Sequence, residues 1–298
     1  MTSGVEEYLK GKAEAVEAAL RGFVSPEAGV PRRLHEAMAY SVFAGGKRLR
    51  PVLVIASAEA CGAPMEKVMP TACALELIHT YSLIHDDLPC MDDDDTRRGK
   101  PTNHKVFGET LALLAGDALL THAFKLIADN GSLPGVPAGA VAEVTRLVAW
   151  AAGPAGMVGG QADDCMAEGR TVSADEAASI HLRKTAALIR ASVVSGAVLA
   201  GAPNPMREGL ATYGEKLGLL FQLTDDILNV EGDAKTMGKA AGSDARRRKA
   251  AYPAVAGIPA SRQRAESLEA EAQAALSALG ARGAILSGLA EYVLRRSH

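Results

Sequence analysis

The sequence predicts an all-α fold in one large domain, and three observations lead to this prediction. Almost every long segment is rich in Ala, Leu, Glu and Lys, with apolar residues three and four positions apart, which places them on one face of a helix. Alternating apolar and polar runs, which are typical of strands, are hard to find. No hydrophilic linker or fixed-period repeat divides the chain. We therefore expect residues 1–298 to form a single domain.

The helical segments are separated by clusters of glycine and proline, which interrupt helices. Counting between these clusters gives roughly ten to twelve helices. The clearest periodic segments are residues 5–20, 65–88, 109–128, 174–200 and 208–228.

Composition and charge exclude several classes of protein. The 35 acidic and 32 basic side chains give a net charge of −3, and 48% of the residues are hydrophobic. These values exclude a disordered or collagen-like chain. They also argue against a nucleic-acid-binding protein, which usually carries an excess of basic residues. We therefore expect no nucleic acid among the partners.

The compartment is predicted from the cysteines and from the uncharged segments. The four cysteines form no CxxC pair, so neither a zinc site nor a disulfide framework is expected. The N-terminus has no basic segment followed by an apolar core, as a signal peptide would. The longest uncharged stretch, residues 191–206, is interrupted by prolines and falls short of the ~20 apolar residues that a membrane span needs. The sequence therefore predicts a cytoplasmic protein without a membrane span.

Six aspartates lie between positions 86 and 95, in the segment HDDLPCMDDDDTRRGKP. Such a run is often a solvated loop, because so many carboxylates repel one another. Here, however, the mostly apolar residues 72–84 lead into Asp86 and Asp87. A buried helix that ends in paired aspartates is costly unless they meet hard cations, which prefer oxygen ligands. A calcium-binding EF-hand is excluded, because the sixth position counted from Asp92 is Arg97 instead of glycine.

Helical geometry adds a further aspartate and a histidine to this candidate site. Asp86 and Asp92 stand about 240° apart around a regular helix, so they share a face only if the helix is distorted. Pro89 lies between them and breaks the helical hydrogen bonds. His79 precedes Asp86 by about two turns and therefore lies on the same face.

A second pair of adjacent aspartates, Asp225 and Asp226, ends another apolar helix, LGLLFQLTDDIL. Gln222 precedes the pair and Asn229 follows it at helical spacing, so both amides lie near it. Two unrelated surface pairs would give the same pattern. We favour a shared divalent-metal site, because two apolar helices that both end in Asp-Asp would be an odd coincidence in a purely structural protein.

Two basic segments supply candidate contacts for an anion. In GGKRLRP, Lys47 and Arg50 stand just before a proline, which favours the start of a helix, where free amides attract anions. Lysine and arginine at such a place suit a phosphate, although a solvated turn is the alternative. The second segment, GKAAGSDARRRK, has Lys239 near its start and Lys249 at its end. Neither nucleotide-binding motif, the P-loop or GxGxxG after a strand, is present, so the combined clusters suit a diphosphate with an apolar tail.

Together these segments resemble the trans-prenyltransferases, the isoprenyl diphosphate synthases. The motifs GGKRLRP, HDDLPCMDDDDTRRGKPTNH, GGQADD, RKTAALI, FQLTDDILN and GKAAGSD occur in the order of that family, from about Lys47 to Pro253. The resemblance implies a bundle of long helices around a deep central cavity, usually a homodimer. It also implies an Mg²⁺-dependent, head-to-tail condensation of isopentenyl diphosphate with an allylic diphosphate.

The resemblance implies a role for each candidate residue. Asp86 and Asp92 on one wall and Asp225 on the opposite wall match the ligands of a cluster of three Mg²⁺ ions, with Asp87 and Asp226 as neighbouring candidate ligands. The remaining candidates are Lys47, Arg50, His79 and Arg98 for isopentenyl diphosphate; Arg97, Lys184, Lys239 and Lys249 for the allylic diphosphate; and Lys184, Thr185 and Gln222 as catalytic groups, the last two with dipoles that face the allylic cation.

The residue types are consistent with the implied chemistry. Cleavage of the allylic carbon–oxygen bond expels diphosphate, whose growing charge Mg²⁺, lysine and arginine stabilise. An apolar cavity shields the resulting cation from water. The double bond of isopentenyl diphosphate then attacks the cation, and a proton is lost to the released diphosphate. No protein nucleophile is required.

Product length is predicted from the two residues that match the floor under the growing chain, Tyr81 and Ser82. An aromatic ring at Tyr81 resembles bacterial enzymes that stop at fifteen carbons, so farnesyl diphosphate is the expected product. Geranylgeranyl diphosphate stays open, because SLIHDDLPCMD and GKPTNHKVFGE also resemble enzymes that make the twenty-carbon product.

One departure and two rival functions remain. The second motif of the family commonly reads DDxxD, but here Asn229 takes its last position. The amide keeps an acceptor oxygen and loses the charge, so we expect weakened metal binding at most.

A class I terpene cyclase would use the same metal chemistry, and Asp225, Asn229 and Asp233 loosely match its second metal triad. A cyclase, however, has no use for the isopentenyl diphosphate residues. A non-catalytic partner subunit would have lost metal ligands that are present here.

Overall fold

The computed structural model describes residues 2–231 and 252–296. The helices are α1 (Thr2–Phe23), α2 (Arg32–Val42), α3 (Leu49–Ala60), α4 (Met69–Asp86), α5 (Asn103–Phe107), α6 (Glu109–Asp129), α7 (Ala138–Ala152), α8 (Met157–Ala167), α9 (Ala174–His181), α10 (Ala187–Ala200), α11 (Asn204–Glu231), α13 (Tyr252–Ala256), α14 (Ile258–Ala275) and α15 (Ala284–Arg295). The strands are β1 (Thr96–Arg97) and β2 (Lys100–Pro101), which pair antiparallel. The predicted all-α fold is confirmed.

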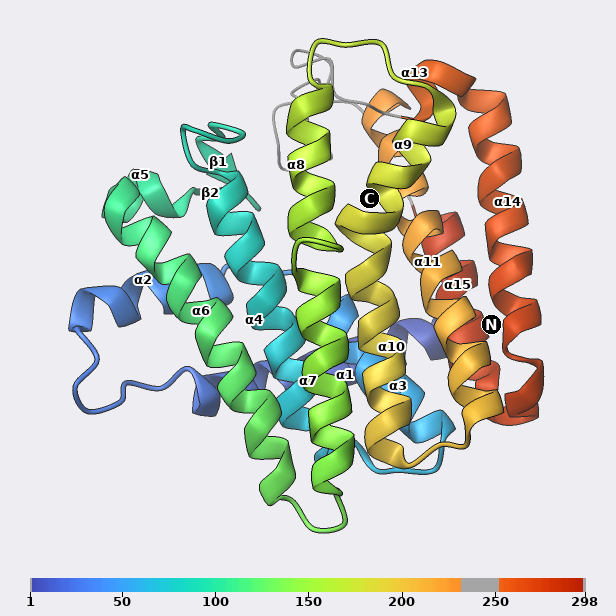
Figure 1. Ribbon diagram of the computed structural model, residues 1–298, viewed down its shortest axis with the longest axis horizontal. Helices are drawn as coiled ribbons and strands as arrows, with labels where there is room; N and C mark the ends of the chain where they lie inside the picture. Colours follow the sequence, from blue (N-terminus) through green and yellow to red (C-terminus); the bar gives the residue numbers. More distant parts are fainter. Residues whose placement is uncertain (1, 232–251, 297–298) are drawn as a thin grey trace.

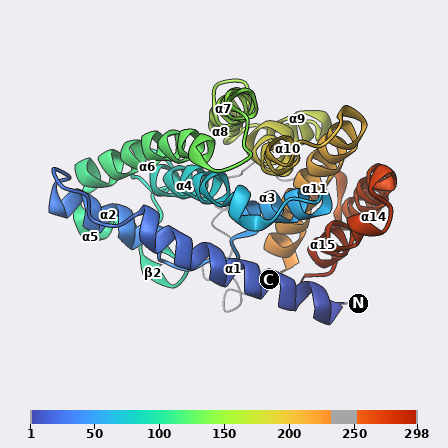
Figure 2. The ribbon, with the colours of Figure 1, turned by 90° about the horizontal axis from the view of Figure 1, so that it is seen from below.

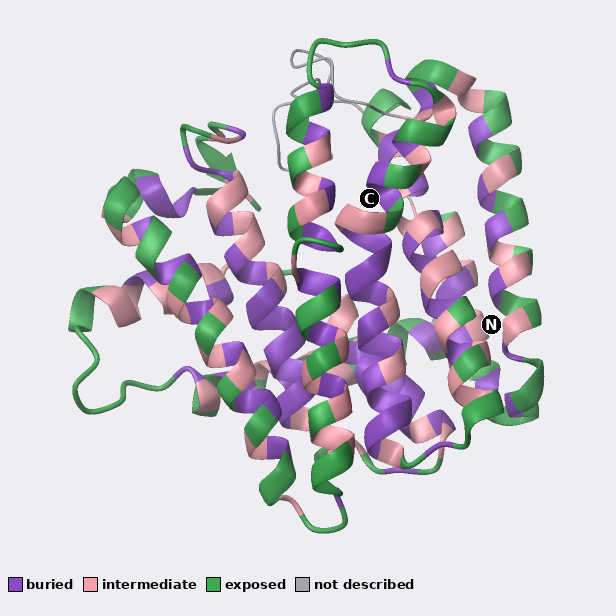
Figure 3. Cartoon of the chain, viewed as in Figure 1, coloured by how far each residue is buried: buried purple, intermediate pink, exposed green. Residues whose placement is uncertain are grey.

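Helices α4 and α10 form the centre of the bundle (Figure 1). Helix α4 packs against α6 and α3, and α10 packs against α11, α3 and α7. Seen from below, α1 runs along one side of the bundle (Figure 2), where it contacts α3, α4 and α15. The central helices are also the most buried ones (Figure 3), because they are apolar around most of their circumference.

Two large apolar clusters of the described residues meet along α3 and α10, and a third, small cluster joins the end of α8 to α9. One large cluster is centred on α4, α6 and α7, and the other on α11, α14 and α15. Helix α3 contributes Ile55 to the first cluster and Leu53 to the second, while α10 contributes Leu188 and Ile189 in the same way. The C-terminal ends of α4 and α11 both reach the top of the bundle in Figure 1, so the two aspartate pairs lie at the same end.

The element boundaries differ from the sequence prediction in instructive places. The segment predicted as a helix over 65–88 begins with a separate 3₁₀ turn, Met65–Lys67, and α4 ends at Asp86. The segment predicted over 174–200 is divided by a π-helical turn, Leu182–Ala186. Such turns occur frequently at functional sites, and this one carries two of the predicted catalytic residues.

One apolar helical stretch within the described ranges, Glu109–Ser132, is long enough to span a membrane by length and composition alone. This is weak evidence for a membrane span, since a core helix of a bundle passes the same test. Its helix, α6, packs against α4 and α2.

Candidate active site

The end of α4 carries the first aspartate motif. The helix stops at Asp86, and the following loop folds back so that the amide of Asp92 donates to the carbonyl of Asp86 at 2.7 Å. The amide of Met91 donates to the carbonyl of Leu88 at 2.8 Å. The expected distortion near Pro89 is therefore the end of the helix, and it brings the backbones of Asp86 and Asp92 together.

Asp87 has a different position from its neighbour. It is buried, and its carboxylate accepts hydrogen bonds from Nε of Arg97 at 2.8 Å and from Nη2 at 2.6 Å. Burial lowers the pKa of Arg97, but the hydrogen bond to Asp87 and the charges of Asp87, Asp86 and Asp94 together raise that pKa overall. Asp87 therefore holds Arg97 in place here, and its predicted role as a metal ligand stays a prediction.

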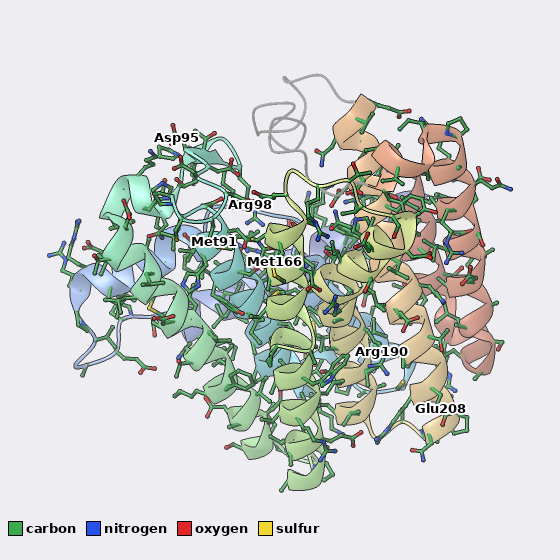
Figure 4. The ribbon with its side chains drawn as sticks, turned by 45° about the horizontal axis from the view of Figure 1, so that its top comes forward. Met91, Asp95, Arg98, Met166, Arg190 and Glu208 are labelled. Atoms are coloured by element: carbon green, nitrogen blue, oxygen red, sulfur yellow. The ribbon has the colours of Figure 1, made fainter. Side chains whose placement is uncertain are left out.

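The β1–β2 hairpin anchors the rest of the first motif. The hydroxyl of Thr102 donates to the carbonyl of Asp94 at 2.8 Å, and its amide donates to the carbonyl of Asp95 at 3.0 Å. Arg98 stands in the turn of this hairpin with a φ of 52°. The hairpin therefore fixes the backbone position of Arg98, which is labelled in Figure 4.

The basic loop GGKRLRP lies directly against this hairpin. The guanidinium of Arg98 donates to the carbonyl of Gly45. A Cβ at Gly46 would lie 2.8 Å from three atoms of that guanidinium, and the φ of Gly46 is +130°. Only glycine suits both the conformation and the space. The structure thus brings the basic loop and the first aspartate motif together.

Four arginines lie close enough to His79 to affect its charge. Burial lowers the pKa of His79 well below its usual value, and Arg50, Arg98, Arg97 and Arg48 lower it further. Burial also lowers the pKa of Arg50 to about 10. The Nε of Arg50 is buried and makes no hydrogen bond to any residue that the structure describes. Concentrated positive charge with an unused donor forms a site for an anion.

Asp225 on α11 faces the same basic loop. Burial raises its pKa, while the neighbouring charges of Arg296, Lys47 and Arg50 lower it. Its carboxylate accepts a hydrogen bond from Nη2 of Arg296 at 2.6 Å. The second aspartate motif and the basic loop therefore share one electrostatic environment.

Arg296 was not predicted from the sequence as a residue of the site. Its side chain is 5% exposed, lies over the ring of Phe221 at 4.0 Å and donates to the Phe221 carbonyl at 2.8 Å. The only signal in the sequence is the pair of arginines at positions 295 and 296, just after an apolar helix. Because the partner Asp225 is 71 positions away, that pair does not by itself indicate a site.

Asp226 points into a different hydrogen-bond network. Nε2 of Gln222 donates to its Oδ1 at 2.9 Å, and the amide of Tyr252 donates to its Oδ2 at 3.0 Å. Nε2 of His181 lies 3.2 Å from the same Oδ2. Both carboxylate oxygens are thus engaged, and Asp226 as a metal ligand stays a prediction.

Thr185 and Gln222, predicted as a pair, are in direct contact. The Thr185 hydroxyl donates to Oε1 of Gln222 at 2.7 Å. Because Asp226 accepts from the other end of the same amide, the orientation of that amide is fixed. The two predicted residues are thus in contact, and their role toward a cation stays a prediction.

Lys184 lies on the π-helical turn, next to α8. Its Nζ donates to Oδ2 of Asp164 at 2.6 Å. Burial raises the pKa of the Cys165 thiol; the charge of Asp92 also raises this pKa, and the charge of Lys184 lowers it. The C-terminal part of α8 is therefore within electrostatic reach of both Lys184 and Asp92 of the first motif, and Met166 marks this part of α8 in Figure 4. Lys239 and Lys249 lie outside the described residues.

The predicted chain-length residues lie on α4 below the first motif. Tyr81 is buried and packs edge-on against His85, with ring centroids 5.7 Å apart. Burial, and then the charge of Asp86, raise the pKa of Tyr81 to about 12. The hydroxyl of Ser82 donates to the carbonyl of His79 at 2.8 Å. The Tyr81 phenol is thus un-ionised at neutral pH and within electrostatic reach of the aspartates.

The sequence profile of the polyprenyl synthetase family matches residues 31–279. The chain belongs to the polyprenyl synthetase family. This membership confirms the predicted resemblance and the prediction that the protein is a prenyltransferase.

Individual relatives cover nearly the whole chain. A farnesyl diphosphate synthase from Geobacillus stearothermophilus is 46% identical over 99% of this chain and 98% of its own. A chloroplastic geranylgeranyl pyrophosphate synthase from Catharanthus roseus is 46% identical over 98% of this chain and 81% of its own. The solved apo structure of an FPP/GFPP synthase from Zymomonas mobilis is 34% identical and covers 99% of this chain and 100% of its own, with a TM-score of 0.86.

Proposed function

We propose that this protein condenses isopentenyl diphosphate with dimethylallyl or geranyl diphosphate, head to tail, and releases farnesyl diphosphate. One observation carries the proposal: Asp225 of the second motif is in electrostatic contact with Lys47 and Arg50 of the basic loop. The same loop is bonded through Gly45 to the hairpin of the first motif. Carboxylates and an anion site are thus combined at one end of an apolar bundle.

The donor set fits Mg²⁺, which takes hard oxygen ligands. Among residues 2–231 and 252–296, no three acidic, histidine or cysteine side chains converge closely enough to hold an ion by themselves. This fits an ion that protein carboxylates hold together with substrate phosphates, as is usual for Mg²⁺. Asp86, Asp92 and Asp225 are the residues that would hold such ions, three in number on our proposal. When bound, the metal neutralises charge on the departing diphosphate.

The two diphosphates are assigned to different basic groups. Lys47, Arg50 and Arg98, with His79 neutral among them, would bind isopentenyl diphosphate, because this group has the unused donor of Arg50. Arg97, and Lys184 on the other side, would bind the allylic diphosphate. Lys239 and Lys249, which are also proposed for the allylic diphosphate, lie outside the described residues.

The chain's own residues then favour each step of the reaction. Arginine and lysine stabilise the diphosphate as the allylic carbon–oxygen bond breaks. Oε1 of Gln222, oriented through Asp226, and the Thr185 hydroxyl present oxygen dipoles to the cation that remains. The apolar residues of the bundle would keep water from this cation. A proton leaves to the released diphosphate after the double bond attacks.

The product assay decides between the candidate functions. Purified protein is incubated with isopentenyl diphosphate and each allylic starter, and the products are separated by chromatography. Farnesyl diphosphate as the end product supports the proposal. Geranylgeranyl diphosphate as the end product supports the second candidate, which the Catharanthus roseus relative favours. A hydrocarbon formed without isopentenyl diphosphate supports a cyclase, and no product supports a non-catalytic subunit.

Assembly and compartment are proposed from the resemblance and from one surface. The outer face of α6 exposes Leu113 and Leu114, which are 46% and 47% exposed. A second copy of the chain would bury this face in a homodimer, and light scattering after size-exclusion chromatography measures the mass. We also propose a cytoplasmic location, which cell fractionation tests.

A further inference from the structure

Arg48 lies in the middle of the basic loop but does not point to where the diphosphate is proposed to bind. It is 3% exposed, and its guanidinium joins three separate parts of the fold. Nη2 donates to Glu17 of α1 at 2.7 Å and to the carbonyl of Val42 at 2.6 Å. Nη1 donates to Glu76 of α4 at 2.7 Å. One side chain therefore connects α1, the end of α2 and α4.

The backbone at Arg48 is held in an unusual conformation. Its φ and ψ are 52° and 34°, the left-handed region that non-glycine residues rarely adopt. Such a conformation costs of order 1–3 kcal/mol and persists where the surroundings fix it. Here the guanidinium contacts fix it, at the residue that caps α3. Lys47 directly precedes this residue, and Arg50 lies in the first turn that follows.

Glu76 also balances the charge beneath the anion site. It is 2% exposed and paired with Arg48. Its charge raises the pKa of Arg50 and of Arg98, both of which burial lowers. A buried arginine group without such a carboxylate would be strongly destabilised. Glu76 lies one turn before His79 on α4, so the same helix carries the counter-charge and a member of the site.

We propose, given the function proposed above, that Arg48 is a positioning residue that sets Lys47 and Arg50 in place for the diphosphate of isopentenyl diphosphate. It acts through its contacts with Glu17, Glu76 and the Val42 carbonyl, and it does not touch the substrate. Arginine is required because its planar fork reaches several acceptors at once, whereas lysine has a single nitrogen.

The test compares Arg48→Lys with Arg207→Lys. Arg207 also joins a carboxylate, Glu143, to a backbone carbonyl, that of Ala202. It lies on α11 about 27 Å before Asp225, from the rise of a helix. For R48K we expect the KM for isopentenyl diphosphate to rise about tenfold, as a misplaced binding group costs up to about 100-fold. The KM for the allylic substrate and kcat stay within about twofold, and R207K leaves all three unchanged.

The outcomes separate this proposal from the function on which it depends. An inactive wild-type protein contradicts the function. An active wild type with an unchanged KM for isopentenyl diphosphate in folded R48K contradicts the positioning role, as does an equal loss for both substrates. If circular dichroism shows that R48K does not fold, Glu17→Gln decides, because Glu17 is on the outer helix and 30% exposed. We expect E17Q to raise the KM for isopentenyl diphosphate about threefold and to leave the KM for the allylic substrate at its wild-type value. An unchanged KM for isopentenyl diphosphate overturns the proposal.

Discussion

Replacing Tyr81 with alanine tests the proposed floor of the cavity. Tyr81 lies five residues before Asp86 on α4, about 7.5 Å along the helix axis. It is 6% exposed, and on the proposed function its ring fills space that a longer hydrocarbon tail would need. We expect Tyr81→Ala to shift the main product from fifteen to twenty carbons.

The size of the ring sets the magnitude of this shift. A cavity of about 150 Å³ is enough to bind benzene, and the phenol ring of Tyr81 occupies space of that order. One isoprene unit adds five carbons, one fewer than benzene, so the freed volume accommodates one further unit. Deleting a buried aromatic side chain costs about 3–5 kcal/mol when the cavity stays empty. We therefore expect a lower melting temperature for the empty variant and a partial recovery when the longer product is bound.

The assay is chromatography of the products formed from isopentenyl diphosphate and geranyl diphosphate. Tyr81→Phe is the matched control, because it keeps the ring and removes only the hydroxyl. If Y81F retains the wild-type product and Y81A lengthens it, ring volume is the determinant. An unchanged product profile in folded, active Y81A would refute the reasoning and exclude Tyr81 as the floor.

Three further predictions follow from other contacts. Gly46→Ala should raise the KM for isopentenyl diphosphate several-fold in steady-state assays, because the new Cβ is strained by about 1–3 kcal/mol and displaces Arg98. His79→Asn should lessen the loss of stability between pH 6.5 and 5, measured in urea titrations. Because the pKa of His79 is lowered in the folded protein, the unfolded state binds the proton first, so stability falls as the pH falls. A steeper loss of stability in the variant would contradict this. Arg296→Met should lower the Mg²⁺ concentration for half-maximal rate about twofold to fivefold, because Asp225 loses its competing cation; an unchanged or higher value would contradict it.

Much of the helical framework could be predicted from the sequence, because apolar periodicity is a local property. The segment 109–128 corresponds to α6, and 208–228 lies within α11. The division of 174–200 by a π-helical turn was not predictable in the same way. That turn depends on how the chain packs against α8 and α11, and nothing in the local spacing of apolar residues records it.

The two aspartate pairs show why a motif does not assign every side chain. Adjacent residues on a helix point about 100° apart, so Asp225 and Asp226 contact different neighbours. Asp225 accepts a hydrogen bond from Arg296, while Asp226 lies 3.2 Å from His181. The sequence indicates that a pair is present, but only the packing of α9 decides which member lies where.

The two proposed diphosphate sites differ in how their charges are balanced before substrate arrives. The allylic side has cations that already hold carboxylates: Arg97 with Asp87, and Lys184 with Asp164. Arg50, in contrast, has a buried donor that makes no hydrogen bond to the described residues. Phosphate oxygens that reach Arg50 gain a hydrogen bond without breaking an ion pair, whereas those that reach Arg97 compete with a buried carboxylate. Binding on the allylic side therefore depends more on additional positive charge, which is the contribution proposed for Mg²⁺.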